Sequence, residues 1–166
     1  MDNKYLDLAI QNAELSFNDG NYPVGAVLTI ENELIGENRN TAEKSKNYSQ
    51  HAETRLILDN AEKMLQAWKD NKEIILYSTL EPCLMCLGVA VMNKVNKIVY
   101  IQSDPLAGAC SLNVNSLGER YKQTYPEIIK LDYSPKPKEM IVSFLKKQIV
   151  EGIRVEWSKN FLKLLE

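Results

Sequence analysis

The sequence of 166 residues predicts an α/β protein with a three-layer α/β/α arrangement, in which a five-stranded mixed sheet carries helices on both faces. Segments with helical spacing of apolar residues alternate with short apolar, β-branched segments, in the order α-β-β-α-β-α-β-(α)-β-α. Hydrophobic residues make up 45% of the chain and charged residues 25%, which excludes a disordered, collagen-like or coiled-coil protein. The length fits a single domain over residues 1–166, with a core over 1–132 and C-terminal helices over 135–166.

The first half of the chain contains an amphipathic helix, a pair of strands and a second helix. In the first helix Tyr5, Leu8 and Ala13 fall at helical spacing, and Gly20 suits the left-handed conformation that ends helices. The strands are predicted from apolar, β-branched residues on either side of a short polar turn. The predicted segments are a helix over 3–17, strands over 24–30 and 34–38, a loop over 40–50 and a helix over 51–65.

The second half alternates strands with helices and ends in a helical segment. Pro82 is expected to open a helix, because proline suits the first helical position, and Gly152 is expected to divide the last helix into two. A connection of about 26 residues between the last two strands permits them to be parallel, which a tight hairpin would not. The predicted segments are a strand over 74–79, a helix over 82–93, a strand over 97–101, a short helix over 113–121, a strand over 128–132 and helix from 138 onward.

Charge and cysteine content narrow the class of protein. Lys and Arg number 20 and Asp and Glu 22, a net charge of −2, whereas proteins that bind nucleic-acid phosphates tightly usually carry a basic excess. Three cysteines do not suit a disulfide framework, and the N-terminus lacks the pattern of a signal peptide. The longest apolar run, Cys86–Met92, is far shorter than the ~18 residues of a membrane span. We therefore expect a cytoplasmic protein without a membrane segment.

Two short motifs carry residues with metal-binding chemistry. They are His51-Ala52-Glu53 and Pro82-Cys83-Leu84-Met85-Cys86, and each begins a predicted helix. Cys83 and Cys86 are three positions apart, so both sulfurs lie on one helical face, in a first turn whose unpaired N–H groups favour thiolates. Two thiolates and the imidazole of His51 make a three-ligand zinc (Zn2+) site. A catalytic zinc site keeps its fourth position for water, whereas a structural site usually fills it with protein.

Glu53 distinguishes a catalytic zinc site from other uses of the same residues. Zinc lowers the pKa of bound water, and a carboxylate beside that water can take its proton and deliver it to a substrate. A purely structural zinc site has no need of this glutamate. Three alternatives stay open: a redox-active Cys-x-x-Cys, a closed structural site completed by Cys110 or a carboxylate, and a zinc-stabilised binding module without activity.

Together the two motifs resemble the zinc-dependent cytidine/deoxycytidylate deaminase superfamily, for which H-x-E followed by P-C-x-x-C is the known signature. The resemblance covers about residues 5–117 and includes Pro23-Val24-Gly25-Ala26-Val27 and Thr79-Leu80-Glu81-Pro82-Cys83. It is nearest to the branch of guanine deaminases, fungal-type cytosine deaminases and bacterial tRNA adenosine deaminases. It implies a hydrolase acting on cyclic amidines, with a cytidine deaminase-like fold whose last two strands run parallel.

The resemblance also implies roles for single residues. Asn40 matches an asparagine that hydrogen-bonds the substrate, although a turn residue is a competing interpretation, and the backbone N–H of Ala52 matches a group that holds a ring carbonyl or an equivalent atom. Asp104 lies where guanine deaminases have an acidic substrate contact, although a turn-forming aspartate before Pro105 is an equally good interpretation. Cys110 has no implied role and is expected to be a small buried residue. The implied zinc ligands are His51, Cys83 and Cys86, and the implied catalytic proton shuttle is Glu53.

Two features of the sequence indicate different substrates. Residues 107–112, Ala-Gly-Ala-Cys-Ser-Leu, resemble tRNA adenosine deaminases, whereas Trp157 and Phe161 resemble guanine deaminases, whose C-terminal segment covers the active site. Clusters of Lys and Arg such as Lys94/Lys97 and Lys146/Lys147 are too small to neutralise several phosphates. We therefore expect a small molecule, a nucleobase or nucleoside of which a guanine-type free base is favoured. The alternatives are adenosine-to-inosine deamination in tRNA and deamination of cytosine or cytidine.

The helix expected over 82–93 bears on the oligomeric state. Leu84, Leu87, Val91 and Met92 fall on more than one of its faces, which indicates burial beyond its own sheet. A central helix packed on both sides within one chain would show the same pattern. The resemblance implies pairing through helices beside the zinc site, so we expect a homodimer.

Overall fold

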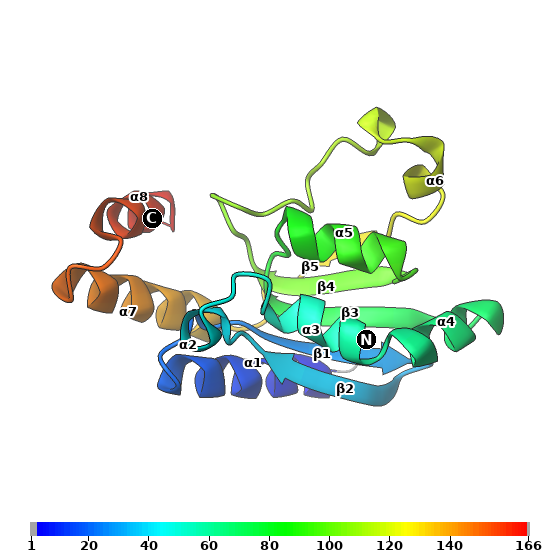
Figure 1. The fold of residues 1–166 in the computed structure, drawn as a ribbon, viewed down its shortest axis with the longest axis horizontal. Coiled ribbons are helices and arrows are strands. Elements are labelled where there is room, and N and C mark those ends of the chain that lie inside the picture. Colours follow the sequence, from blue (N-terminus) through cyan, green and yellow to red (C-terminus); the bar gives the residue numbers. More distant parts are fainter. Residues whose placement is uncertain (1–2, 166) are drawn as a thin grey trace.

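The computed structural model describes residues 3–165 and is built on one five-stranded sheet (Figure 1). The strands are β1 (Gly25–Ile30), β2 (Glu33–Arg39), β3 (Ile74–Leu80), β4 (Lys97–Gln102) and β5 (Glu127–Lys130). Their order in the sheet is β2-β1-β3-β4-β5. β1 is antiparallel to both of its neighbours, and β4 is parallel to both of its own. The mixed sheet and the parallel pairing of the last two strands are therefore confirmed.

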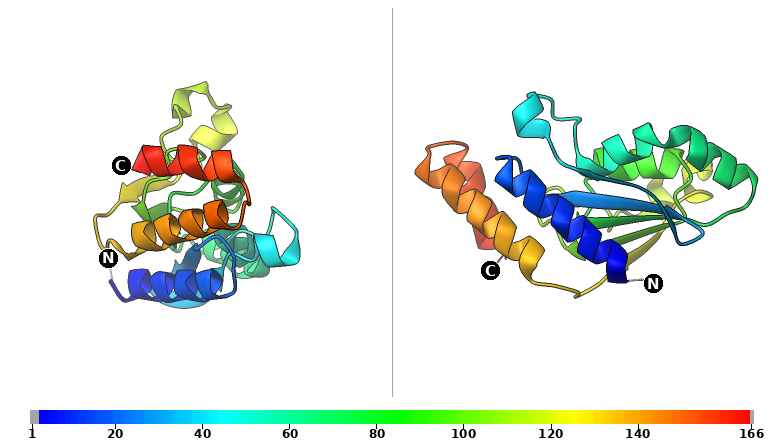
Figure 2. Two further views of the ribbon diagram at one scale, coloured as in Figure 1. Left: turned by 90° about the vertical axis from the view of Figure 1, so that its left-hand side faces the viewer. Right: turned by 90° about the horizontal axis from the view of Figure 1, so that it is seen from below.

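Helices cover both faces of this sheet, as predicted. They are α1 (Asn3–Asn18), α2 (Ala42–Ser45), α3 (Ala52–Asp59), α4 (Ala61–Lys69), α5 (Leu84–Met92), α6 (Glu119–Lys122), α7 (Lys136–Val150) and α8 (Val155–Leu165), with a 3₁₀ turn over Val114–Ser116. α1 covers one face, and α3 and α5 cover the other (Figure 1). α7 lies beside α1, and α8 folds back along α7 at one end of the molecule (Figure 2).

Alternation along the strands divides the core into two layers, because successive side chains of a strand point to opposite faces. Val27 and Tyr77 pack against α1, whereas Leu28 and Leu76 face the layer of α3 and α5. All seven residues of β3 are buried, as its uninterrupted apolar run predicts for a central strand.

Close packing of α1 on β1 explains the glycine of the Pro-Val-Gly segment. A Cβ atom on Gly25 would lie 2.1 Å from the Ala9 carbonyl oxygen and 2.6 Å from the Ala13 nitrogen. The Gly25 N–H also donates a hydrogen bond of 3.1 Å to Thr79 Oγ1, which ties the start of β1 to the end of β3. Any larger residue at position 25 would push the helix away from the sheet.

Several helix boundaries differ from the prediction, each for a local reason. The helix expected over 51–65 divides at Asn60, whose side-chain amide donates to the Leu56 carbonyl at 2.9 Å. Pro82 precedes the helix instead of opening it, because Cys83 is extended and serves as the N-cap residue. The loop over 40–50 contains the short helix α2, and the helix expected over 113–121 is replaced by a 3₁₀ turn and α6.

The carboxyl ends of β3 and β4 define the end of the sheet at which chemistry is expected. β3 leads directly into α5, and the N-terminus of α3 lies beside the start of α5 (Figure 1). Both sequence motifs therefore meet at this end. No helix within residues 3–165 has the length and apolar character needed to cross a membrane.

Candidate metal centre

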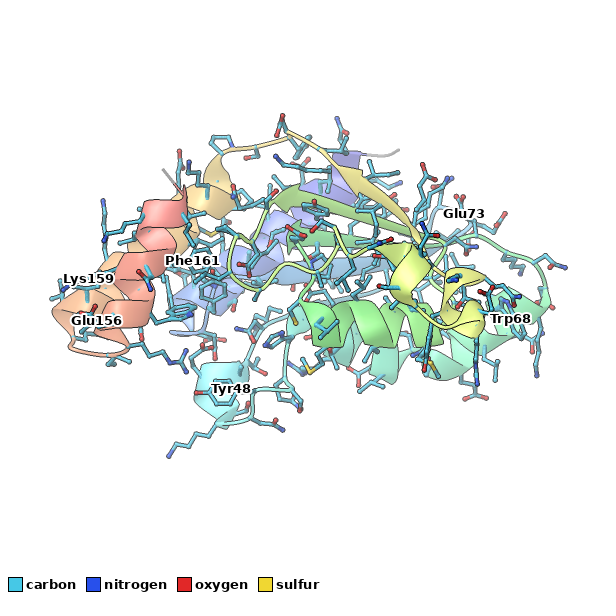
Figure 3. All side chains as sticks on the ribbon, turned by 90° about the horizontal axis from the view of Figure 1, so that it is seen from above. Tyr48, Trp68, Glu73, Glu156, Lys159 and Phe161 are labelled. Carbon is cyan, nitrogen blue, oxygen red and sulfur yellow. The ribbon has the colours of Figure 1, made fainter. Side chains whose placement is uncertain are left out.

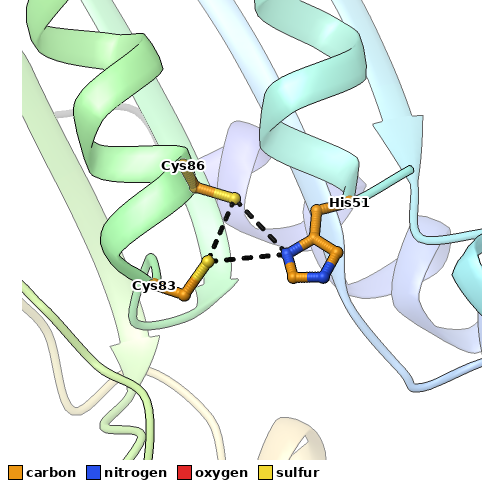
Figure 4. Close-up of side chains that lie close together, drawn as sticks. All are labelled: His51, Cys83 and Cys86. Carbon is orange, nitrogen blue, oxygen red and sulfur yellow. Dashed lines mark hydrogen bonds between the residues drawn. The ribbon is translucent and has the colours of Figure 1, made fainter. Parts of the chain in front are cut away.

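The N-termini of α3 and α5 bring three donor atoms together. His51 and Cys83 are the N-cap residues of these helices, with extended backbones (ψ of 152° and 172°), so both side chains stand at helix starts. Cys86 lies in the first turn of α5 and is fully buried. His51 Nδ1 is 3.6 Å from Cys83 Sγ and 3.5 Å from Cys86 Sγ, and the two sulfurs are 3.7 Å apart (Figure 4).

These three distances fit a single tetrahedral zinc ion. Zn–S bonds of ~2.3 Å and Zn–N bonds of ~2.0 Å at tetrahedral angles place two sulfurs ~3.8 Å apart and a sulfur and a nitrogen ~3.6 Å apart. Within residues 3–165, His51, Cys83 and Cys86 form the one group of such side chains close enough to share an ion, and Cys110 is outside it. A set of three protein ligands is typical of catalytic zinc, which keeps one position for water or substrate.

The two cysteines of this group differ in how readily they lose their protons. Hydrogen bonds with Cys86 and His51 lower the pKa of Cys83 to about 4. The shared proton and burial raise the pKa of Cys86, and the hydrogen bond with Cys83 raises the pKa of His51. Cys83 is therefore a thiolate at neutral pH, and Cys86 carries the proton that a bound metal displaces.

Glu53 is held beside the ligands and is buried on α3. Its Oε1 accepts a hydrogen bond of 3.1 Å from Ser78 of β3, and its Oε2 accepts one of 3.5 Å from the Cys86 thiol. Burial raises the pKa of Glu53, and the charge on His51 and the Ser78 hydrogen bond oppose that effect. A buried carboxylate with a raised pKa is suited to accept a proton and release it again.

A cavity of about 490 Å³ borders the metal-binding group. Ala52 is not among the residues that line it. It is the first helical residue of α3, buried, with a backbone N–H that has no acceptor within the helix. Cys86 lies behind the cavity wall. The other predicted site residues line the cavity: Asn40, His51, Glu53, Cys83 and Asp104.

Asn40 is both a turn residue and a cavity residue. Its Nδ2 donates hydrogen bonds to the Tyr22 carbonyl at 3.0 Å and to the Glu43 carboxylate at 3.3 Å. Its Oδ1 accepts one from the Ala42 N–H at 3.1 Å, at the start of α2. These contacts fix the amide in one orientation on the cavity wall.

The segment over 104–110 forms a second wall, which Glu81 holds in place. The buried Glu81 carboxylate accepts hydrogen bonds from the backbone N–H groups of Asp104 (3.1 Å) and Cys110 (3.0 Å). A Cβ atom on Gly108 would lie 2.4 Å from the Glu81 carboxyl carbon, so only glycine fits there. Asp104 Oδ1 also accepts two backbone hydrogen bonds from the turn that follows, which confirms the turn-forming interpretation, and Asp104 lines the cavity as well.

Helix α8 supplies a third wall of the cavity through Trp157 and Phe161. At the corner between α7 and α8, Arg154 Nη2 donates a 2.8 Å hydrogen bond to the Tyr48 hydroxyl, and Arg154 Nη1 lies 3.6 Å from Glu43 Oε1. Figure 3 shows Phe161 on the inner side of α8 and Tyr48 on the segment opposite. The C-terminal helix is thus tied across the cavity mouth to the segment around α2.

Residues that brace the site were missed by sequence reasoning. Ser78 and Glu81 lie within five positions of Cys83 on the strand that leads to it, a signal that could have indicated them. Tyr22 and Arg154 approach the cavity only through the tertiary fold, so nothing local marks them. The missed residues are Tyr22, Tyr48, Ser78, Glu81 and Arg154, with Thr54, whose Oγ1 lies 3.4 Å from Cys86 Sγ.

Known proteins share both the sequence and the architecture of this chain. Residues 1–102 match the family described as the cytidine and deoxycytidylate deaminase zinc-binding region. The tRNA-specific adenosine deaminase of Bacillus subtilis (strain 168) is 36% identical over 128 residues, which cover 77% of this chain and 78% of the relative.

Two solved structures resemble this one. One comes from a study of A-to-I editing by tRNA:A34 deaminases at the wobble position, with a TM-score of 0.65 at 25% identity, covering 77% of this chain and 97% of the other. The second, guanine deaminase from Bacillus subtilis, has a TM-score of 0.54 at 29% identity, covering 63% of this chain and 66% of the other.

A mixed α/β sheet with three zinc-binding side chains at two helix starts and a buried glutamate beside them is typical of hydrolytic zinc deaminases. The chain belongs to the cytidine and deoxycytidylate deaminase family, as the match over residues 1–102 shows. It is a hydrolase that acts on cyclic amidines and takes zinc as its cofactor. This assignment favours the deaminase over the redox and binding-module alternatives.

Proposed function

We propose that this enzyme converts adenosine to inosine in a tRNA substrate. The observation that carries the proposal is the 36% identity, over 77% of the chain, to a tRNA-specific adenosine deaminase. The more similar of the two solved structures, by TM-score, belongs to the tRNA:A34 deaminases. These relatives support the alternative that the sequence left open and do not support the guanine-type free base that it favoured.

In the proposed reaction the bond between C6 of adenine and its amine breaks, a C–O bond forms, and ammonia leaves. His51, Cys83 and Cys86 would hold the zinc ion, which would supply an activated water at neutral pH. Glu53 would accept one proton of that water and pass it to the ring nitrogen N1, and would then take the proton that remains on the attacking oxygen and pass it to the leaving amine. The Ser78 hydrogen bond keeps the Glu53 carboxylate turned toward the ligands throughout.

We assign the contacts to the substrate base to two groups on the cavity wall and to one backbone N–H at the start of α3. Asn40 is fixed by three hydrogen bonds and presents its amide to the cavity. The free N–H of Ala52 lies at the start of α3, next to both His51 and Glu53 in sequence. Asp104 contributes its carboxylate from the wall that Glu81 holds. We propose that these three residues bind the substrate.

A second candidate is deamination of a small free nucleobase, and a specific observation favours it. Trp157 and Phe161 of α8 close one side of the cavity, and Arg154 ties that helix to Tyr48 across the mouth. A cavity closed in this way suits a single base better than a polynucleotide. The 29% identity to a guanine deaminase is consistent with such a substrate.

An ammonia-release assay over a panel of substrates separates the two candidates. The panel contains guanine, cytosine and adenine, their nucleosides and nucleotides, and a tRNA anticodon stem-loop carrying adenosine, with a guanosine stem-loop as control. We expect kcat/KM for the adenosine stem-loop to exceed that for free adenine by at least about 10²-fold, because truncated substrates lose remote binding energy. Release from guanine alone would instead establish the second candidate.

We further propose that the enzyme is a homodimer that pairs through α5. Leu84 and Met92 on this helix are 67% and 45% exposed, although both are large and apolar. They border an apolar groove that α5 forms with the segment over 112–125. An exposed apolar patch of this kind is typical of a protein–protein interface.

Sedimentation tests whether the protein is a homodimer. The wild type should sediment at twice the chain mass of 18.9 kDa at micromolar concentration, and Leu84→Asp combined with Met92→Asp should sediment at the chain mass itself. Leu15→Asp is the matched control, since Leu15 is 50% exposed on α1 and should leave the dimer intact. A wild type that sediments only as the single chain rejects the dimer.

A further inference from the structure

Tyr22 occupies a central position in the cavity wall. Its ring lies edge-on to Phe144 with centroids 5.3 Å apart, and stacks on Phe161 at 6.3 Å. Its carbonyl accepts hydrogen bonds from Ser16 Oγ (2.9 Å) and Asn40 Nδ2 (3.0 Å). The residue is therefore fixed at its backbone and at its ring, and cannot turn away from the cavity without breaking these contacts.

The hydroxyl group of Tyr22 is the exception to this network. Its oxygen is buried and has no hydrogen-bond partner among residues 3–165, although Tyr22 lines the cavity. A buried polar group without a partner lowers stability, and such groups in native proteins are usually satisfied by something. Of the described residues that line the cavity, Tyr22 alone has a buried side-chain oxygen or nitrogen that lacks a hydrogen-bond partner.

The charges around this hydroxyl keep it protonated. Burial and the carboxylates of Asp104 and Glu43 raise the pKa of Tyr22 well above its ordinary value. The group is therefore an O–H donor at neutral pH and not a phenolate. Since Tyr22 is a cavity residue, a base bound in the cavity is a candidate to supply the acceptor that this hydroxyl lacks.

We propose that Tyr22 is a specificity-determining residue whose hydroxyl donates a hydrogen bond to a ring nitrogen of the bound base. This inference rests on the proposed function in taking the base to be adenine. N1 of adenine receives its proton from Glu53 in that function, which leaves N3 and N7 as the acceptors on the ring. The bound base thus supplies the partner that Tyr22 lacks in the free enzyme.

Tyr22→Phe tests the assignment because it removes one oxygen and keeps the ring contacts. Without ligand, the zinc-loaded variant should melt on the order of 5 °C higher than the wild type, since an unpaired buried hydroxyl is gone. On the adenosine stem-loop its KM should rise about five- to tenfold while kcat changes less than about twofold. A hydroxyl with a purely structural partner would show the opposite shift in melting temperature.

Tyr125→Phe is the matched control. The Tyr125 hydroxyl is also buried without a partner among the described residues, but it borders the α5 groove and not the cavity. This variant should melt above the wild type as well, and its KM should equal that of the wild type. A rise in KM for Tyr22→Phe alone therefore reports on the substrate and not on loss of a buried hydroxyl in general.

Stem-loops with 3-deazaadenosine or 7-deazaadenosine at the target position identify the acceptor. One of the two should raise the wild-type KM about five- to tenfold and leave the KM of Tyr22→Phe unchanged, because the same bond is removed from either side. The assignment is overturned if, for both analogues, the increase in KM caused by the analogue multiplies the increase caused by Tyr22→Phe, because the two changes then act independently. So does an unchanged KM for Tyr22→Phe on adenosine, or a lower melting temperature for the ligand-free variant.

Failure of the proposed function gives a different result. A wild type that deaminates another panel member and not the stem-loop contradicts the tRNA substrate, and Tyr22 is then tested on the substrate that reacts. A raised KM for Tyr22→Phe on that substrate supports Tyr22, and an unchanged KM overturns it. A wild type that deaminates nothing in the panel contradicts both.

Discussion

Glu53→Gln should keep its zinc and its fold while kcat falls by at least the ~10²–10⁴-fold ascribed to a positioned acid–base group. The glutamine amide has the size of the carboxylate, and its oxygen can still accept the 3.1 Å hydrogen bond from Ser78. The amide nitrogen then faces Cys86 Sγ, at the position where Glu53 Oε2 now lies 3.5 Å away. What the variant lacks is a group that can take and release a proton.

Metal analysis, thermal melting and ammonia release together check this result. Glu62→Gln is the matched control, because Glu62 is exposed on α4 and the change is chemically identical. It should leave zinc content, melting temperature and kcat at the wild-type values. Loss of zinc from Glu53→Gln would show that Glu53 is a ligand, and full activity would refute its role in proton transfer.

Cys86→Ala should lose zinc, stability and activity together. Cys86 is one of three ligands and is fully buried, so its sulfur has no substitute among the described residues. A ligand present at a thousand times its Kd stabilises the folded state by about 4 kcal/mol. For a protein of this size, that loss lowers the melting temperature on the order of 10 °C. Zinc content per chain should fall well below one.

Cys110→Ala is the control for the loss of a cysteine. Cys110 is also buried, but lies outside the metal-binding group. Burial raises the pKa of its thiol to about 12, so it stays protonated at neutral pH. This variant should keep one zinc per chain and its activity. Full zinc occupancy in Cys86→Ala would remove Cys86 from the ligand set.

The local parts of this structure could be predicted from sequence because their signals are local. The uninterrupted apolar run of β3 identified the central strand, and the short spacing between Cys83 and Cys86 placed two sulfurs on one turn. The two motifs identified the zinc-binding side chains, whose donor atoms the fold brings within 3.7 Å of one another. The division at Asn60 was missed, because a helix period continues across it and only the side-chain hydrogen bond to Leu56 marks the break.

The substrate side of the site was harder to predict, because its walls come from distant parts of the chain. Tyr22 meets Phe161, and Arg154 meets Tyr48, through contacts that no spacing in the sequence reports. Net charge does not identify the substrate either. A total of −2 says nothing about where the charges lie, and RNA contacts depend on local clusters of Lys and Arg.

The contact between Arg154 and Tyr48 spans 106 positions, and this separation sets an order of events during synthesis. Ribosomes add ~5–20 residues per second from the N-terminus. Cys86 completes the metal-binding side chains 69 residues before α8 begins at Val155 (155 − 86), and this stretch takes ~3–14 s to make. The growing chain therefore contains every zinc ligand before α8 exists. Its cavity lacks the wall that Trp157 and Phe161 form until α8 has been made, so the pocket is completed only after the metal-binding group.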